Sequence, residues 1–290
     1  MGIMKLRDRL EERRLLCAMG VYDALTAKIV EEYGFECLYL TGYGVSAGTY
    51  AYPDIGLVTM TEMVEAAKRI TDRVSLPLIV DADTGYGNSV NIIRTVKEFE
   101  KAGAQAIQLE DQMWPKRCGH MEGKSVIPEA DMKSKICAAV DSRKSEDTLI
   151  IARTDVLALE GLDAAIERGS LFAEWGADII FIEAPEDIGQ VKTIPERIKT
   201  PTLLNLAPKT PCFSVDEIEQ MGYSIAIYPG ICFTAAYTAC IEALTEFKET
   251  GRQANLVYWK NNFNTINDLM GLTKYRELES IYADCDCITR

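Results

Sequence analysis

Short apolar runs rich in β-forming residues alternate with helical stretches along most of the chain, and this alternation constrains the fold more than any other feature. The runs are continuously hydrophobic, which is typical of parallel strands covered on both faces. Eight such strands are predicted, at Leu15–Ala18, Cys37–Thr41, Leu78–Asp83, Ala106–Glu110, Leu149–Arg153, Ile179–Glu183, Thr202–Asn205 and Ser224–Tyr228. Helices are predicted between or after them, for example at Ala24–Tyr33, Thr61–Arg73, Val90–Ala102, Leu162–Trp175 and Thr234–Glu249. Eight repeated βα units predict an α/β fold, a closed (β/α)8 barrel.

The chain is predicted to form one domain over residues 1–290, a length that a closed α/β barrel commonly reaches. No linker rich in Pro, Gly or Ser divides it. Residues 255–290 are predicted to be a helical extension with no further strand, and its helical segments lie around Asn262–Met270 and Lys274–Tyr282. Extra helices of this kind pack on a neighbouring subunit or close one end of the barrel.

The formal charge of −13 and the pI near 4.7 oppose binding to nucleic acid or to an anionic membrane. No apolar run approaches the roughly 20 residues needed to cross a bilayer. The nine cysteines are scattered and include no CxxC pair, which indicates a reducing compartment. We therefore expect a cytoplasmic protein whose partner is a small molecule, and an anionic substrate requires cations within the site.

Carboxylates follow two neighbouring predicted strands. Asp81 and Asp83 end the third strand and Glu110 ends the fourth. In a barrel the active site lies at the carboxyl ends of the strands, so these hard oxygen donors are expected to meet there. Mg²⁺ prefers such ligands, keeps several waters and is completed by substrate oxygens. The alternative is that the acids cap the following helices or pair with Arg153.

The segment after the fourth strand places a thiol among cations. Lys116 and Arg117 precede Cys118, and His120, the chain's only histidine, follows it. Nearby positive charge lowers the pKa of a thiol, so Cys118 is expected to exchange a proton or act as a nucleophile. Glycines at 119 and 123 suit a segment that moves as a lid. The alternative is an ordinary solvated basic loop.

Cationic side chains near the strand ends suit an anionic substrate. The planar guanidinium groups of Arg153 and Arg117 can bind a carboxylate in a bidentate manner. Arg153 is alternatively a structural partner of the acids, and both roles are compatible. Lys124 and Lys209 lie outside the predicted strands, which disfavours a Schiff-base lysine.

Three motifs together resemble the isocitrate lyase/phosphoenolpyruvate mutase superfamily: DADTGYGN at 81–88, EDQ at 110–112 and KRCGH at 116–120. The likeness continues through IARTD at 151–155, Glu183, Asn205 and the Tyr228–Pro229 pair. The cysteine in the third motif indicates the lyase branch. The resemblance implies a barrel whose eighth helix is swapped between subunits, usually in a homotetramer, which fits the predicted extension.

The resemblance also implies roles for individual residues. Asp81, Asp83 and Glu110 hold Mg²⁺ directly or through water, with Mn²⁺ as an alternative ion, and Asp54 belongs to the same network. The implied catalytic residues are Cys118, His120, Glu183 and Tyr43, and the implied substrate-binding residues are Thr41, Gly42, Tyr43, Arg153, Arg117 and Asn205. Cys118 protonates the carbanion left after cleavage, while Tyr43 and Glu183 are alternative general bases.

These roles predict a Mg²⁺-dependent lyase that cleaves a 2-hydroxy dicarboxylate to pyruvate and a second carboxylic acid. Relatives that cleave methylisocitrate carry an arginine where this chain has Thr234, and a glutamate in the loop after Asn205 that is absent here. The preferred substrate is therefore 2,3-dimethylmalate, which yields propionate and pyruvate. 2-Methylisocitrate is the alternative, because Lys209 can supply a cation. Oxaloacetate hydrolysis or decarboxylation on the same barrel is disfavoured by Pro229, and a binding scaffold with a vestigial site is the non-enzymatic alternative.

Overall fold

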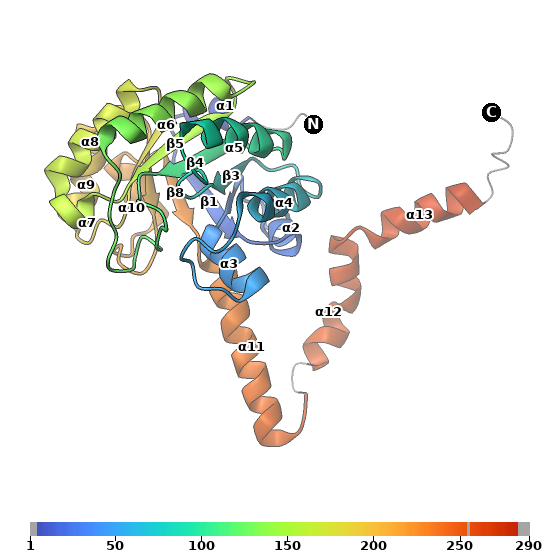
Figure 1. Ribbon diagram of the computed structural model, residues 1–290. Helices are drawn as coiled ribbons and strands as arrows, with labels where there is room; N and C mark the ends of the chain where they lie inside the picture. Colours follow the sequence, from blue (N-terminus) through green and yellow to red (C-terminus); the bar gives the residue numbers. More distant parts are fainter. Residues whose placement is uncertain (1–4, 254–255, 284–290) are drawn as a thin grey trace, which may run out of the picture. The chain divides into compact units, whose positions relative to one another are not determined.

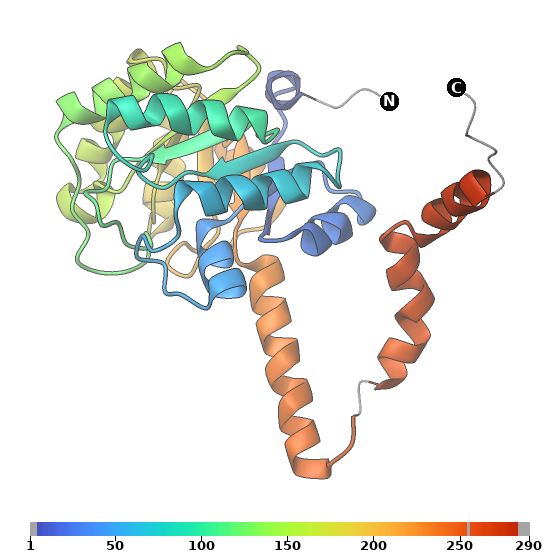
Figure 2. The same ribbon diagram turned by 45° about the vertical axis from the view of Figure 1, so that its right-hand side comes forward.

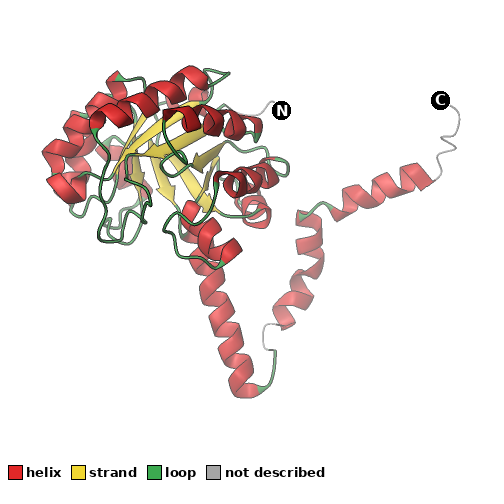
Figure 3. Ribbon diagram, in the orientation of Figure 1, coloured by secondary structure: helices red, strands yellow, loops and turns green. Residues whose placement is uncertain are grey.

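The computed structural model describes residues 5–253 and 256–283 and contains a closed barrel of eight parallel strands in sequence order. The strands lie at the centre of the first part of the chain and helices surround them (Figures 1 and 3). Their bounds are β1 Leu16–Val21, β2 Cys37–Leu40, β3 Leu78–Asp81, β4 Ala106–Glu110, β5 Leu149–Thr154, β6 Ile179–Ile182, β7 Thr202–Asn205 and β8 Ile225–Tyr228. Strand β8 pairs with β1 and closes the barrel, which confirms the predicted fold.

The helices that follow the strands form the outer layer, which Figure 2 shows from a second direction. Their bounds are α2 Ala24–Glu32, α3 Gly42–Tyr50, α4 Met60–Thr71, α5 Ser89–Lys101, α6 Glu129–Ser142, α7 Leu157–Glu160, α8 Leu162–Glu174, α9 Ile188–Arg197 and α10 Val215–Met221. One further helix, α1 Leu6–Glu11, precedes β1. Helices α1, α3 and α7 were not predicted. Strand β3 ends at Asp81, two residues before the predicted end, so Asp83 lies in the following loop with a φ of 48°.

Helix caps at both ends of the helices follow the usual residue preferences. Asn88 begins α5 with a capping box, in which its side chain accepts from the backbone N–H groups of Val90 and Asn91. Gly222 ends α10 in the left-handed region at a φ of 94°, which a glycine adopts without steric cost. These local signals fix where each βα unit turns back onto the sheet.

Two apolar layers hold the barrel together. The larger lies between the sheet and the outer helices, and the smaller fills the barrel interior. Leu6 of α1 packs against the interior cluster. The interior side chains come from alternate strand residues, namely Leu16, Ala18, Cys37, Tyr39, Ile79, Ala106, Leu149, Ile151, Ile179, Phe181, Leu203, Ile225 and Ile227. Because strand side chains alternate between faces, the next inward position along each strand lies at its carboxyl end.

The chain divides into two compact units, residues 1–233 and 234–290, and each is described by itself. The second contains most of α11 Ile231–Thr250, together with α12 Leu256–Leu269 and α13 Leu272–Ala283. Helix α11 has no buried residue, and its exposed large side chains are Ile231, Tyr237, Ile241, Leu244 and Phe247. The outer ends of the predicted extension, 255 and 284–290, lie outside the described residues. Among described helices, none has the length and hydrophobicity to cross a bilayer.

Candidate active site

The predicted strand-end residues occupy the last inward-facing position of their strands or, for Glu183, the position directly after β6. Each follows an apolar or polar interior residue by two positions, so period-2 alternation turns it toward the barrel mouth. Five such side chains are buried at the mouth: Asp81, Glu110, Arg153, Glu183 and Asn205. The sequence therefore brings carboxylates, a guanidinium group and an amide together at one end of the barrel.

Four carboxylates, Asp54, Asp81, Asp83 and Glu110, form what we call the acid cluster. Lys116, whose side chain is 3% exposed, lies among them, with its Nζ 2.5 Å from Asp54 Oδ1 and 2.7 Å from Asp83 Oδ1. Burial nevertheless raises the pKa of Asp81 and Glu110, and raises the pKa of Asp83 to about 7. The positive charge near the acid cluster is therefore insufficient to keep all its members in their ordinary ionisation range.

The donor set of the acid cluster fits a hydrated divalent cation. Within residues 5–253 and 256–283, no three His, Cys, Asp or Glu side chains converge as ligands of one ion. Mg²⁺ instead takes one or two carboxylates and keeps several waters. In the same described ranges, the buried Glu110 Oε1 and Tyr86 Oη have no hydrogen-bond partner. These two atoms are suited to metal-bound water.

The segment Lys116–Lys124, here called the cysteine loop, lies across the same mouth. On one side the N–H of Cys118 donates to the Asp54 carbonyl oxygen at 3.1 Å. On the other side Lys124 Nζ donates to Asp155 at 2.9 Å and also to the Gly119 carbonyl oxygen. Cys118 and the acid cluster therefore share one end of the barrel, which the predicted chemistry requires.

Arg153 is the cation shared by three buried carboxylates. Its Nε lies 2.8 Å from Asp155 and 3.4 Å from Glu110, and its Nη1 lies 3.0 Å from Glu183. Burial alone would raise the pKa of Asp155, but Arg153 and Lys124 hold it down at about 2. Arg153 thus has the predicted structural role as the ion-pair partner of these acids. Its guanidinium group lies at the mouth of the barrel.

His120 joins the cysteine loop to β6 and β7. Its Nε2 lies 3.0 Å from Glu183 Oε1, and its Nδ1 accepts from the backbone N–H of Lys209 at 3.3 Å. The second contact leaves the imidazole hydrogen on Nε2, which faces the carboxylate. Asn205 Nδ2 also donates to Glu183 Oε1, at 3.2 Å. Burial would raise the pKa of Glu183, but Arg153 and His120 together hold it below its ordinary value.

The expected lowering of the Cys118 pKa is wrong. Burial raises the pKa of the Cys118 thiol, and the hydrogen bond from the His120 backbone only partly offsets this. Arg117 does not reverse the effect, and its exposed side chain donates to the Glu122 carbonyl oxygen at 3.1 Å. A protonated thiol suits a proton donor rather than a nucleophile.

The segment after β2 begins a helix rather than an open loop. Thr41 is the N-cap of α3 and accepts from the Gly44 N–H at 3.2 Å. Gly42 lies against the acid cluster, since a Cβ there would be 2.8 Å from Asp81 Oδ2. Tyr43 is 42% exposed and packs edge-to-face on Phe233, with ring centroids 5.6 Å apart. The structure thus brings Gly42 to the acids and leaves Tyr43 and Arg117 at the rim.

Comparison with known proteins decides the family. Residues 6–248 match the family described as phosphoenolpyruvate phosphomutase. The chain is 46% identical over 281 residues to a 2,3-dimethylmalate lyase of Eubacterium barkeri, covering 96% of this chain and 97% of the relative. It belongs to the isocitrate lyase/phosphoenolpyruvate mutase superfamily. It is therefore an enzyme of a carbon–carbon lyase and mutase superfamily, as the motifs predicted.

Two further members of this superfamily are similar over most of their length. A 2-methylisocitrate lyase of Aeropyrum pernix is 42% identical over 277 residues, which are 95% of this chain and 89% of the relative. A solved phosphonopyruvate hydrolase, in complex with oxalate and Mg²⁺, superposes with a TM-score of 0.88 at 29% identity. That comparison covers 96% of this chain and 98% of the hydrolase.

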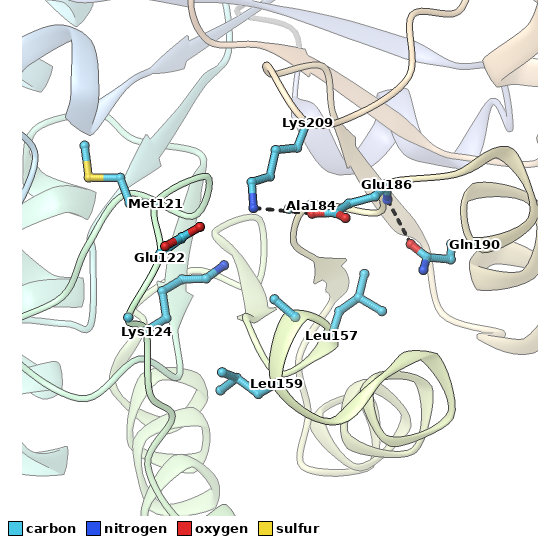
Figure 4. Close-up of a pocket in the computed structure, with 11 residues that line it drawn as sticks. Met121, Glu122, Lys124, Leu157, Leu159, Ala184, Glu186, Gln190 and Lys209 are labelled. Atoms are coloured by element: carbon cyan, nitrogen blue, oxygen red, sulfur yellow. Dashed lines mark hydrogen bonds and ion pairs between the residues drawn. The ribbon is translucent and has the colours of Figure 1, made fainter.

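A pocket of about 380 Å³ lies beside the mouth of the barrel (Figure 4). One wall is the end of the cysteine loop, including Glu122 and Lys124, and the opposite wall includes Glu186 and Lys209. The Lys209 ammonium group points to Glu186 and lies 3.3 Å from its Oε1. Lys209, the predicted cation for the additional carboxylate of 2-methylisocitrate, is therefore already paired with Glu186.

Sequence reasoning did not name Tyr39 and Gln108 as site residues, and it did not pair Lys116 with the acid cluster or Asp155 with Arg153. Lys116 reaches the acid cluster and Asp155 binds Arg153. Tyr39 and Gln108 lie one inward position below the mouth, on β2 and β4. Strict alternation along the strands predicts the last two, because Gln108 precedes Glu110 by two residues. Lys116 and Asp155 lie in loops, where no sequence period predicts the direction of a side chain.

Gly119 is expected to tolerate no side chain. A Cβ there would lie 2.4 Å from Arg153 Nη2 and 2.6 Å from Glu183 Cγ, so the cysteine loop could not approach as closely. We expect Gly119→Ala to lower kcat by about 10²-fold, since a shift of about 1 Å in a catalytic group has effects of this size. Steady-state kinetics of the purified variant measure the change. Gly189→Ala, in the exposed first turn of α9, is the matched control, and equal kcat values for the two variants would contradict the expectation.

Proposed function

We propose that the enzyme cleaves 2,3-dimethylmalate to pyruvate and propionate. The observation that carries this proposal is the position of Cys118. Its backbone N–H donates to the Asp54 carbonyl oxygen, and Lys116 ties its loop to Asp54 and Asp83. Cleavage of a carbon–carbon bond next to a carboxylate requires a cation to stabilise the developing negative charge and a proton donor for the carbanion. The relative at 46% identity, a 2,3-dimethylmalate lyase, supports the choice of substrate.

We propose Mg²⁺ as the metal, which Asp81, Asp83 and Glu110 would hold directly or through water, with Asp54 in the same network. The uncompensated charge of the acid cluster supports this, as does the Mg²⁺ in the related phosphonopyruvate hydrolase complex. When bound, Mg²⁺ would supply positive charge for the substrate oxygens as negative charge develops on them. Mn²⁺ has the same preference for oxygen ligands and is the alternative ion.

The side chains around the acid cluster divide the remaining work. The N-terminal turn of α3 at Gly42 and the guanidinium group of Arg153 bind the carboxylate that pyruvate will keep. A base removes the 2-hydroxyl proton, the C2–C3 bond breaks, and its electron pair passes to C3 to give the enediolate of propionate. The Cys118 thiol then protonates C3.

The lowered pKa of Glu183 makes its carboxylate a poor base. We therefore propose that Glu183 orients His120, and we retain Tyr43 as the candidate base.

Pyruvate release from three substrates tests the proposed specificity. With Mg²⁺ present, we expect kcat/KM to be highest for 2,3-dimethylmalate, lower for 2-methylisocitrate, and lowest for oxaloacetate, whose cleavage is followed as oxalate or pyruvate. A higher kcat/KM for 2-methylisocitrate would overturn the substrate assignment but retain the reaction class. No cleavage of any of the three would overturn the reaction class itself.

2-Methylisocitrate remains the second candidate because the Aeropyrum pernix relative is a 2-methylisocitrate lyase. Its additional carboxylate needs a cation or several hydrogen-bond donors. Lys209 is engaged by Glu186, and Thr234 offers only a hydroxyl group. If Lys209 served this carboxylate, Lys209→Met would raise KM for 2-methylisocitrate and leave KM for 2,3-dimethylmalate unchanged.

Binding of Mg²⁺ is expected to release a proton from Asp83. The pKa of Asp83 is raised to about 7 by burial, so below pH 7 the carboxyl group holds a proton that the metal must displace. The apparent Kd for Mg²⁺ should therefore rise as pH falls through 7, by up to about tenfold per pH unit. Calorimetry at pH 6 in two buffers of different ionisation enthalpy measures the number of protons released. A Kd independent of pH between 5.5 and 8 would contradict this expectation.

The remaining expectations concern assembly and location. We propose a homotetramer in which the helix after β8 is exchanged between subunits, acting in the cytoplasm on a small-molecule substrate. The exposed apolar side chains of α11 support this, because isolated helices rarely expose so many without a partner surface. Light scattering of the purified protein measures the assembly, and a monomer at micromolar concentration would overturn it.

A further inference from the structure

The apolar interior of the barrel contains two polar side chains below the mouth. Gln108 on β4 is 0% exposed and Tyr39 on β2 is 3% exposed. Their neighbours at comparable inward positions are hydrophobic, such as Ile151 and Phe181. A glutamine without solvent must have its amide satisfied by protein groups, because an unpaired buried polar group is destabilising.

The two side chains form one hydrogen-bonded chain that ends on the acid cluster. The Tyr39 hydroxyl donates to Gln108 Oε1 at 3.0 Å, and Gln108 Nε2 donates to Asp81 Oδ1 at 3.3 Å. A carboxylate accepts hydrogen bonds, so the amide nitrogen must face Asp81 and the amide oxygen must face Tyr39. The backbone N–H of Asp83 donates to the same Asp81 Oδ1 at 3.1 Å.

This chain leaves the second oxygen of Asp81 directed at the mouth. A Cβ on Gly42 would lie 2.8 Å from Asp81 Oδ2 and 3.7 Å from Asp83 Oδ1, which places Oδ2 next to the substrate-binding segment and the neighbouring acid. Two donors thus fix Oδ1, the Gln108 amide from the barrel interior and the Asp83 N–H from the loop after β3, while Oδ2 faces the space that the proposed metal would occupy. The rotation of the carboxylate about its Cβ–Cγ bond is therefore determined.

We propose that Gln108 is a positioning residue that, supported by Tyr39, orients Asp81 toward the divalent cation. This rests on the proposed metal site and goes further, because it assigns a role to two residues that touch neither metal nor substrate in the proposed scheme. Hydrogen bonds that orient ligands from outside the coordination sphere commonly change metal affinity by 10- to 100-fold. Stability does not explain the pair, since replacing a buried polar pair by apolar side chains of similar shape is often neutral or stabilising.

The decisive experiment is a Mn²⁺ titration of the metal-free full-length protein at pH 7.5, without substrate, followed by the electron paramagnetic resonance signal of free Mn²⁺. Three forms are compared: wild type, Gln108→Met, and the double variant Tyr39→Phe/Gln108→Met. We expect both variants to bind Mn²⁺ about 10- to 100-fold more weakly than wild type. The double variant should keep the melting temperature of the metal-free wild type, because neither partner is left unpaired.

Two additional variants separate positioning from packing. Ile151→Val disturbs the same interior layer without touching the chain, and it should lower the melting temperature while leaving the Mn²⁺ Kd within twofold of wild type. Tyr39→Phe keeps the donor to Asp81 and should weaken Mn²⁺ binding less than Gln108→Met. Equal Mn²⁺ affinity in wild type and the double variant would overturn the positioning role alone. A wild type that binds no Mn²⁺ would overturn the proposed metal site and this inference with it.

Discussion

Cys118→Ser is expected to lose about 10²- to 10⁴-fold in kcat, the range that a well-placed proton donor contributes. Burial raises the pKa of the thiol, which keeps it protonated and suits it to give a proton to the proposed carbanion. A serine hydroxyl of similar size is a much weaker acid and fails at that step. Rates of pyruvate release from 2,3-dimethylmalate measure the loss.

The same variant should bind Mg²⁺ as wild type does, because Cys118 is tied to the acid cluster only through its backbone N–H. Calorimetry with Mg²⁺ alone measures this. Cys137→Ser is the matched control, since Cys137 is a free cysteine on α6, away from the mouth. Near-normal turnover in Cys118→Ser would refute its role as the proton donor.

Arg153→Met is expected to lower the free energy of unfolding by about 3–5 kcal/mol, the usual cost of removing one partner from a buried ion pair. Arg153 is shared by Asp155, Glu183 and Glu110, so its loss leaves three buried carboxylates short of positive charge. Urea denaturation of the metal-free protein at pH 7.5 measures the change. A loss below about 1 kcal/mol would show that the network relaxes around the missing cation.

The direction of the pH effect in Arg153→Met provides a second measurement. Without Arg153 the pKa of Asp155, now held at about 2, should rise above its unfolded value. A carboxyl group whose pKa is raised on folding destabilises the protein at higher pH, and protonation removes that penalty. The variant should therefore recover part of its stability as pH falls from 7 to 5. Arg197→Met is the control, since its ion pair with Asp163 is largely exposed and contributes little.

The barrel could be predicted from the sequence because its strands are continuously apolar and each is followed by a helix. The strand-end residues could be predicted for the same reason, since parallel strands bring their carboxyl ends to one edge. Asp81, Glu110 and Arg153 are found where that rule places them. The rule is topological, so it does not depend on the details of packing.

The path of the cysteine loop could not be predicted in this way. Lys116 and Arg117 are adjacent and chemically similar, but only Lys116 turns into the acid cluster, while Arg117 binds the backbone of its own loop. The pKa of Cys118 was predicted in the wrong direction because burial outweighs the neighbouring cations. Both outcomes depend on tertiary contacts that neighbouring sequence does not reveal.

The interior of the barrel has a consequence for the order of events in turnover. Leu6 and the strand side chains fill the end opposite the mouth, so we expect both products of the proposed reaction to leave on the side of the cysteine loop. In the proposed reaction, the fragment nearest the loop is expected to depart first, and pyruvate, bound against Gly42, is expected to depart last. Pyruvate should then inhibit competitively against 2,3-dimethylmalate, because both bind the empty enzyme, whereas propionate should inhibit noncompetitively.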